Sequence, residues 1–226
     1  MYPTANEIRI AIDVLSGLID KGFIKGLSYK ENPNGYYVKE IYEWCENHED
    51  YFAEKHLFLT FGETKVCVVA DGLKNWVIKV DFNKSTDPYY GPNYPSMCQV
   101  EANNYKCACA RGIEGYFAAT YAMGSVNGLN YFLQERVVVD EAAISSSFQE
   151  YCCVGDEDEE DMDEIYMRIC DMDDDERLRA IFGDDEGARE LVDFVDEFEI
   201  NDLHEGNYGI RKDGSIVIID FSGYVG

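Results

Sequence analysis

The residues best suited to chemistry lie near the carboxyl end of this 226-residue chain. Asp202 and Asn207 belong to the segment Asn-Asp-Leu-His-Glu-Gly-Asn, and Asp220 opens Asp-Phe-Ser-Gly after the next apolar run. Carboxylate and amide oxygens are hard ligands of the kind that magnesium prefers. Phosphoryl transfer needs such a metal, together with a carboxylate beside the attacking hydroxyl. The types and spacing of these residues therefore predict a phosphoryl-transfer site.

The segments upstream of these residues predict an antiparallel sheet with one helix. Alternating or continuous β-branched and aromatic residues, separated at hairpin spacing by turns such as Asn127-Gly128, are typical of strands. We predict strands over residues 57–61, 65–70, 75–82, near 115–123 and over 129–139, with a helix over 97–111 between the third and fourth strands.

Helical periodicity dominates both ends of the chain. Residues 4–21 show it behind a Thr4/Glu7 capping-box pattern, and residues 36–53 follow the turn Asn32-Pro-Asn-Gly. Further helices are predicted over 142–153, 162–171 and 187–198, before a hairpin built on Lys212-Asp-Gly-Ser. The fold class is therefore α+β, divided into a helical layer (1–55), a sheet-bearing part (56–139) and a helical part (140–226).

The loop and hairpin near the carboxyl end resemble those of the protein-kinase-like superfamily. Its catalytic loop has an asparagine five residues after an aspartate, as Asn207 follows Asp202, and its metal-binding Asp-Phe-Gly ends the next hairpin, as Asp220 does. The resemblance implies that Asp202 orients or deprotonates a hydroxyl, while Asn207 and Asp220 hold Mg²⁺ against ATP. His204, at a family lysine position, either contacts the transferred phosphate or makes a structural hydrogen bond.

Val77-Ile-Lys79 on the third predicted strand resembles the family's Val-Ala-Ile-Lys, and alternation puts Val77 and Lys79 on one face. A lysine within an apolar strand is costly unless it reaches an anion. The resemblance implies that the phosphates and Glu101 of the following helix supply one. The alternative is an exposed ion pair, contributing well under about 1 kcal/mol. Other expected nucleotide contacts are Gly62, between the first two strands, and Val137, which ends a hinge-like segment.

Several family features are missing. The glycine-rich phosphate loop is reduced to Gly62-Glu-Thr, and Ile200 and Asn201 replace the His-Arg that precedes the family's catalytic aspartate. The chain ends at Gly226, soon after Asp220, so we expect no activation segment and a reduced, mainly helical C-terminal lobe. A platform for a protein substrate would then come from a partner or a second copy.

Charge and composition limit the function further. The net charge is −26, and residues 155–186 hold sixteen acidic side chains against three arginines, a net charge of −13. Such a surface repels nucleic acid and either attracts a basic partner or is simply solvated. With no apolar run of membrane-spanning length, no signal-peptide pattern and no Cys-x-x-Cys pair, we expect a cytoplasmic protein with free thiols.

Together these features predict an ATP- and Mg²⁺-dependent phosphotransferase that transfers the γ-phosphate to an unknown hydroxyl, on a small molecule or a basic protein. The alternative is a catalytically weak pseudokinase, an acidic interaction module that binds a basic partner.

Overall fold

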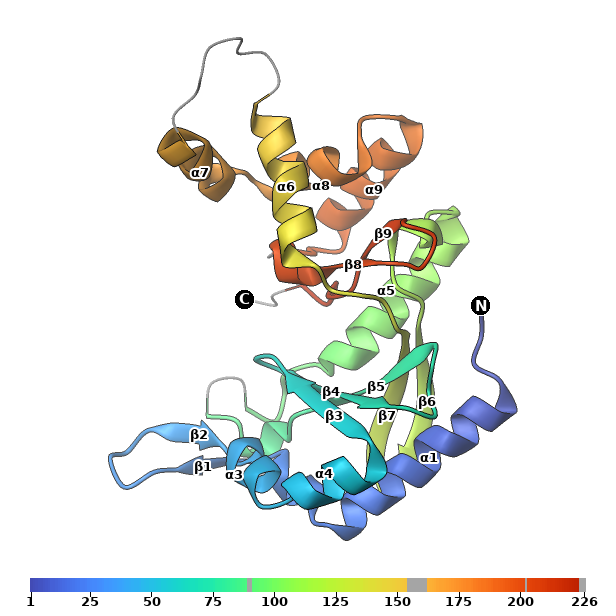
Figure 1. Ribbon diagram of the computed structural model, residues 1–226, viewed down its shortest axis with the longest axis vertical. Helices are drawn as coiled ribbons and strands as arrows, with labels where there is room; N and C mark the ends of the chain where they lie inside the picture. The colour runs from blue at the N-terminus through green and yellow to red at the C-terminus, as the bar shows by residue number, and fades with distance from the viewer. Residues whose placement is uncertain (89–90, 154–161, 202, 224–226) are drawn as a thin grey trace. The chain divides into compact units, whose positions relative to one another are not determined.

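The computed structural model describes residues 1–88, 91–153, 162–201 and 203–223 of the chain (Figure 1). It divides into two compact units, called here the sheet unit (Met1–Asn103 and Ala119–Arg136) and the helical unit (Asn104–Ala118 and Val137–Gly226). The three-part division expected from the sequence is a different partition and stays a prediction. Among the described helices, none combines the length and the apolar character that a membrane crossing requires.

The sheet unit joins an N-terminal helical segment to a two-stranded and a five-stranded sheet. Its elements are α1 (Ala5–Asp20), α2 (Phe23–Gly26), β1 (Tyr29–Glu31), β2 (Tyr37–Lys39), α3 (Ile41–Glu46), α4 (Glu49–Lys55), β3 (Leu57–Phe61), β4 (Lys65–Ala70), β5 (Trp76–Asp81), the 3-10 turn η1 (Lys84–Thr86), the first part of α5 (Met97–Arg111), β6 (Thr120–Val126) and β7 (Leu129–Glu135).

The five strands of the large sheet pair antiparallel in the order β3-β4-β5-β7-β6. The predicted strands and helix occur in the expected chain order, so the α+β class with a five-stranded antiparallel sheet is confirmed. The strand expected near 115–123 begins later, at Thr120, because the preceding residues form the 3-10 turn η2 (Glu114–Tyr116) of the helical unit.

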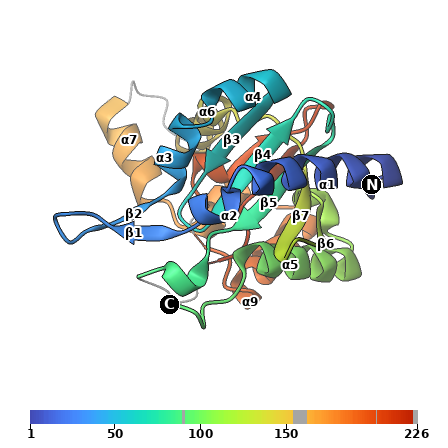
Figure 2. The ribbon, with the colours of Figure 1, turned by 90° about the horizontal axis from the view of Figure 1, so that it is seen from below.

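One face of the sheet is apolar and is crossed by α1 (Figure 2). Thr4 and Glu7 form the predicted capping box at the start of α1, which satisfies backbone N–H groups of its first turn. Successive side chains of a strand alternate between faces, so one set of side chains faces α1. Fully buried residues of α1 and of this face are Ala11, Leu15, Leu18, Val66, Val68, Ile78, Val80 and Leu133.

The other face of the sheet is polar. The register pairs Cys67 with Lys79 and Lys65 with Asp81, so these four side chains share that face. Gln134 lies on the same face and donates a hydrogen bond of 3.0 Å to the Thr120 hydroxyl. Three buried apolar residues lie where the first turns of α5 cover this face: Cys98, Ala102 and Phe132.

The helix predicted over residues 36–53 is wrong in its first part. Tyr37–Lys39 forms β2, which pairs with β1, and α3 and α4 follow as separate short helices. The turn at Asn32 is confirmed, because Gly35 at φ 82° donates to the Asn32 carbonyl and closes a hairpin. Aromatic and β-branched residues after the turn favour the strand over the helix.

Besides the second part of α5, the helical unit carries four helices in the described residues, together with a short hairpin. Its elements are the second part of α5, η2, α6 (Glu141–Cys152), α7 (Met162–Asp171), α8 (Asp174–Phe182), α9 (Glu186–Glu197), the 3-10 turn η3 (Glu205–Asn207), β8 (Tyr208–Ile210) and β9 (Ile216–Ile218). The predicted helices match α6, α7 and α9, whereas α8 was not predicted. Its start is fixed by a capping box between Asp173 and Glu176.

The hairpin on Lys212-Asp-Gly-Ser is confirmed. β8 and β9 pair antiparallel, and the Asp213 carboxylate accepts hydrogen bonds from the backbone N–H and hydroxyl of Ser215. Gly214 adopts φ 89° in this turn, a conformation that favours glycine. The hairpin brings the segments around Asn207 and Asp220 to the same end of the two strands.

Candidate functional site

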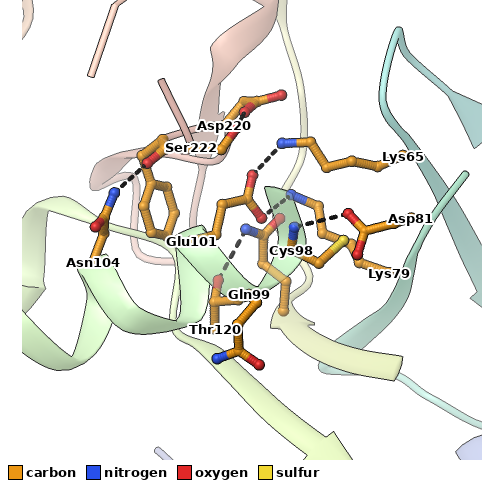
Figure 3. Close-up of polar contacts among 12 residues, drawn as sticks. Lys65, Lys79, Asp81, Cys98, Gln99, Glu101, Asn104, Thr120, Asp220 and Ser222 are labelled. Carbon is orange, nitrogen blue, oxygen red and sulfur yellow. Dashed lines mark hydrogen bonds and ion pairs between the residues drawn. The ribbon is translucent and has the colours of Figure 1, made fainter. Parts of the chain in front are cut away.

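Lys79 and Glu101 form the ion pair that the sequence predicted. The Lys79 ammonium donates to Glu101 Oε2 at 2.9 Å, and the residues are 5% and 0% exposed (Figure 3). Period-2 alternation on β5 aims Lys79 at the polar face, where α5 carries Glu101. The alternative of an exposed surface pair is therefore wrong, and the pair lies where desolvation makes charge interactions strong.

A second lysine, which the sequence analysis missed, holds the other oxygen of the same carboxylate. Lys65 donates to Glu101 Oε1 at 2.5 Å and is itself 6% exposed. Lys65 opens β4 and lies diagonally across from Lys79 on the neighbouring strand, on the same face. Its position at the start of an apolar strand was visible in the sequence, but its approach to Glu101 depends on the strand register. Lys65, Lys79 and Glu101 are called the two-lysine cluster below.

The start of α5 is tied to β5 by a single carboxylate. Asp81 Oδ2 accepts from the Ser96 hydroxyl at 2.5 Å. Asp81 Oδ1 accepts from the Cys98 backbone N–H at 3.1 Å (Figure 3). Ser96 in turn accepts from the backbone N–H of Gln99. A carboxylate at a helix N-terminus satisfies open N–H groups and favours the helix dipole. Asp81 therefore fixes α5 so that Glu101, one turn further along, faces Lys79.

Cys98, beside this tie, stays in its thiol form. Burial raises its pKa well above the ordinary range, and the negative charges of Asp81 and Glu101 raise it further. The thiol packs as a small apolar group with Ala102 and Phe132. It has no place in the proposed chemistry.

Gly62 lies in the tight turn between β3 and β4, and its backbone is already engaged. Its N–H donates to the Lys65 carbonyl at 3.1 Å, and its carbonyl accepts from the Lys39 ammonium at 2.8 Å. Glu63, next to it, accepts from Lys39 at 3.2 Å. The N–H and the carbonyl of Gly62 are therefore already hydrogen-bonded within the chain. This disfavours a backbone cradle for phosphate at Gly62.

The two valines expected at the nucleotide lie in different units. Val77 is half-buried on the polar face of the sheet, opposite Gln134. Val137 belongs to the helical unit, and its side chain fills the space beside Gly209, where an added Cβ would come within 2.1 Å. The N–H groups of Glu135, Arg136 and Val138 bind carbonyls within the chain, and the described residues show no backbone partner for Val137.

Asn207 and Asp220 lie close together at the open end of the β8–β9 hairpin. The Asn207 carbonyl accepts from the N–H of Ile219 at 2.9 Å, which extends the hairpin pairing to the residue before Asp220. Both side chains are half-buried, and Asp220 Oδ1 accepts from the Ser222 hydroxyl at 3.2 Å. The hairpin thus brings both residues predicted as metal ligands to the same end of its two strands, and their binding of a metal stays a prediction.

The segment after Asp220 is fixed at two points within the helical unit. The buried side chain of Asn104, in the second part of α5, donates to the Phe221 carbonyl at 2.8 Å. Gly223 has φ 71°, and a Cβ there would come within 2.3 Å of the Glu199 carbonyl oxygen. Glycine is therefore required one position later than in the family's Asp-Phe-Gly, because a backbone passes against it.

Asp202 lies outside the described residues, but the next residue is held firmly. The Leu203 backbone N–H donates to Asp174 Oδ1 at 3.0 Å, and its carbonyl accepts from Arg177 at 3.5 Å. Arg177 also donates to the carbonyls of Ile169 and Met172. The sequence analysis did not identify Asp174 and Arg177 as partners of this loop, because both lie in the acidic segment that was interpreted as a solvated or partner-binding surface.

His204 has a structural role in the loop. It is exposed, and its Nδ1 accepts a hydrogen bond of 3.1 Å from the N–H of Gly206, so it caps η3. This contact requires the ring proton to be on Nε2 when the ring is neutral. The structural hydrogen bond anticipated for His204 is therefore present, and contact with a phosphate stays a prediction.

The donor set at the hairpin suits Mg²⁺ in its chemistry. Asp220 offers a carboxylate and Asn207 an amide oxygen, which are hard ligands. The described residues hold no group of three or more His, Cys, Asp or Glu side chains arranged for a metal. A bound Mg²⁺ keeps several water or phosphate ligands, so two protein ligands are compatible with it.

The assignment of these residues rests on their geometry and on the family resemblance described above. The sequence matches no protein-family model and no curated protein.

Proposed function

We propose that the chain is an ATP- and Mg²⁺-dependent phosphotransferase with a kinase-like fold. The observation that supports this proposal most is the buried ion pair between Lys79 and Glu101. Burying such a pair costs desolvation energy that apolar residues would not incur, so its presence favours a functional role over a stabilising one. The order of five strands, one helix and a late hairpin agrees with the same proposal.

Each proposed role belongs to a named side chain. In the sheet unit, Lys79 binds phosphate oxygens, and Glu101 holds its ammonium in place. In the helical unit, Asn207 and Asp220 would hold Mg²⁺, whose charge would offset that of the phosphates. Asp202 orients or deprotonates the attacking hydroxyl, a role that the family resemblance of the loop implies. The acceptor is a hydroxyl of a small molecule or of a basic protein.

A catalytically weak pseudokinase, an acidic interaction module that binds a basic partner, is the second candidate function. The engaged turn at Gly62 and the charge of −13 over residues 155–186 favour it, because the first weakens phosphate binding and the second attracts basic partners. The same Lys79–Glu101 pair would serve both functions, so turnover is what separates them.

Two measurements on the full chain test the proposal. Calorimetry with MgATP measures binding, and transfer of labelled γ-phosphate to the protein or to water measures turnover. We expect both activities in the wild type, and loss of transfer in Asp202→Ala and Asp220→Ala. Asp193→Ala is the matched control, because Asp193 is exposed on α9 and belongs to no proposed site.

The outcomes separate the candidates. Binding without transfer in the wild type would replace the first function with the second. Absence of any ATP binding would contradict both. Equal transfer in Asp202→Ala and the wild type would remove the proposed catalytic role of that residue.

A further inference from the structure

We infer that Lys65 is a second phosphate-binding residue, so that the two-lysine cluster recognises a polyphosphate chain rather than a single phosphate. The inference rests on the proposed nucleotide-binding role of Lys79. It adds a residue that neither the family resemblance nor the sequence pattern assigned.

The geometry of the two-lysine cluster favours linked phosphates. Each lysine takes one oxygen of the Glu101 carboxylate, at 2.5 Å for Lys65 and 2.9 Å for Lys79. A shared carboxylate thus holds two ammonium groups side by side, on adjacent strands and on one face of the sheet (Figure 3). Two neighbouring cations match the repeated negative charge of linked phosphates better than one cation does.

The desolvation energy of the two-lysine cluster also favours a function for Lys65. An ion pair that only joined β5 to α5 would need one lysine, and a second buried ammonium adds the desolvation cost of another ion. The two ammonium groups also repel each other. Because α5 is already tied to β5 by Asp81, Lys65 is not required to fix the helix.

The turn before Lys65 favours the same role. Lys65 directly follows the turn of Gly62, Glu63 and Thr64, where the family resemblance expects a backbone cradle for phosphate. That turn is short, and the Gly62 N–H is bound to the Lys65 carbonyl. A lysine at the end of the turn supplies by its side chain the positive charge that the missing glycine-rich backbone would have supplied.

Calorimetry with two probes, MgATP and inorganic tripolyphosphate, tests the inference. We compare the wild type with Lys65→Met, Lys79→Met and the double variant. Each single variant is expected to lose about tenfold to a hundredfold in affinity for both probes, the scale of one charge-assisted hydrogen bond, and the double variant is expected to lose binding. Lys74→Met is the matched control, because Lys74 is an exposed lysine of the same sheet unit.

The two probes separate this inference from the proposed function. Binding of tripolyphosphate through both lysines, without binding of ATP, would support the inference and contradict the phosphotransferase. Binding of ATP that is lost in Lys79→Met and unchanged in Lys65→Met would contradict the inference alone. A wild type that binds neither probe would contradict both.

Labelling of the wild type gives an answer even if the variants fail to fold. An acyl phosphate of ATP transfers its acyl group to a lysine beside the phosphates: the amine forms an amide bond, the carbon–oxygen bond to phosphate breaks, and a proton is released. Mass spectrometry then identifies the acylated peptide. Labelling at both Lys65 and Lys79 is expected, whereas labelling at Lys79 without Lys65 would contradict the inference.

Discussion

The sheet unit and the helical unit present their candidate residues in opposite ways. Lys65, Lys79 and Glu101 lie on strands and a helix, and none of them is more than 6% exposed. Asn207 and Asp220 flank two short strands and are half-buried. Buried charges must be held by the fold, whereas half-buried polar side chains keep much of their hydration. We therefore expect changes in the first group to affect folding as well as ligand binding, and changes in the second to affect ligand binding alone.

The largest effect is expected from Glu101→Ala. It leaves two buried ammonium groups without the carboxylate that they share, which should lower the free energy of unfolding by about 3–5 kcal/mol. Urea unfolding followed by circular dichroism measures the change. Glu46→Ala, an exposed position on α3, should change stability by less than about 0.5 kcal/mol. A loss below about 1 kcal/mol in Glu101→Ala would show that the cluster is hydrated rather than buried.

A smaller effect is expected from Arg177→Ala in the helical unit. This change removes the donor to the carbonyls of Ile169, Met172 and Leu203, and we expect a loss of about 1–3 kcal/mol in unfolding free energy. Arg177→Lys should recover part of it, because an ammonium keeps the charge without the planar fork. The same urea experiment measures both variants.

Arg179→Ala is the matched control for Arg177, since it lies on the same helix with an exposed side chain. If the two alanine variants lose equal stability, the contacts of Arg177 to the loop contribute nothing. Cleavage by a protease near Leu203 provides a second readout, and Arg177→Ala should accelerate it.

The two capping boxes test whether the units unfold together. Thr4→Ala in α1 and Asp173→Ala in α8 should each cost about 1 kcal/mol. Both tryptophans, Trp44 and Trp76, lie in the sheet unit, so their fluorescence follows that unit, whereas circular dichroism follows both. With independent units, Asp173→Ala leaves the fluorescence transition in place. A shift of that transition would show cooperative unfolding.

A fall in pH should weaken the capping box that Thr4 and Glu7 form at the start of α1. Burial raises the pKa of Glu7, but hydrogen bonds from the Thr4 backbone and hydroxyl and from Asn75 outweigh it, so the pKa is lowered overall. The stabilising contribution of Glu7 is therefore present above the ordinary glutamate pKa of about 4 and is lost as the pH falls through the lower folded value. Glu7→Gln should flatten this part of the stability profile, and an unchanged profile would contradict the shift.

The smallest effect on stability is expected from Asp220→Asn. Because Asp220 is half-exposed, the free energy of unfolding should change by less than about 0.5 kcal/mol. Affinity for Mn²⁺, used as a probe for Mg²⁺, should fall at least about tenfold, as removal of even an outer contact of a metal ligand does. Destabilisation by several kcal/mol without a change in Mn²⁺ affinity would reverse the contrast between the two units.

Local sequence patterns predicted the strands of the sheet well, because β-branched alternation and short turns are local signals. They also predicted α5 with its observed bounds, 97–111, although its buried face contains Glu101, Asn104 and Tyr105, and polar residues on a buried face weaken the helical stripe. The helix α8 was missed because its capping box, at Asp173 and Glu176, lies inside a run of like charges that resembles a solvated surface.

The candidate site was predictable from the sequence in part. Lys79 and Glu101 could be paired because the family resemblance implies a partner on the helix after the lysine strand, and the order of elements in the chain agrees with it. Lys65 could not be added, because its approach to Glu101 depends on which residue of β4 faces which residue of β5. Likewise, Leu203 is hydrogen-bonded to Asp174 and Arg177, which lie 29 and 26 positions before it in the chain. These bonds use the backbone atoms of Leu203, which carry no sequence signal.

The tie between Asp81 and the start of α5 also determines where this chain tolerates a change of length. A residue inserted before Ser96 lengthens a connection and leaves the phase of the helix unchanged. A residue inserted between Ser96 and Glu101 turns every later side chain by about 100° around the helix axis. Glu101 would then leave both lysines while Asp81 still held the helix start. Relatives of this chain should therefore vary in length ahead of Ser96 and keep the interval from Ser96 to Glu101 constant.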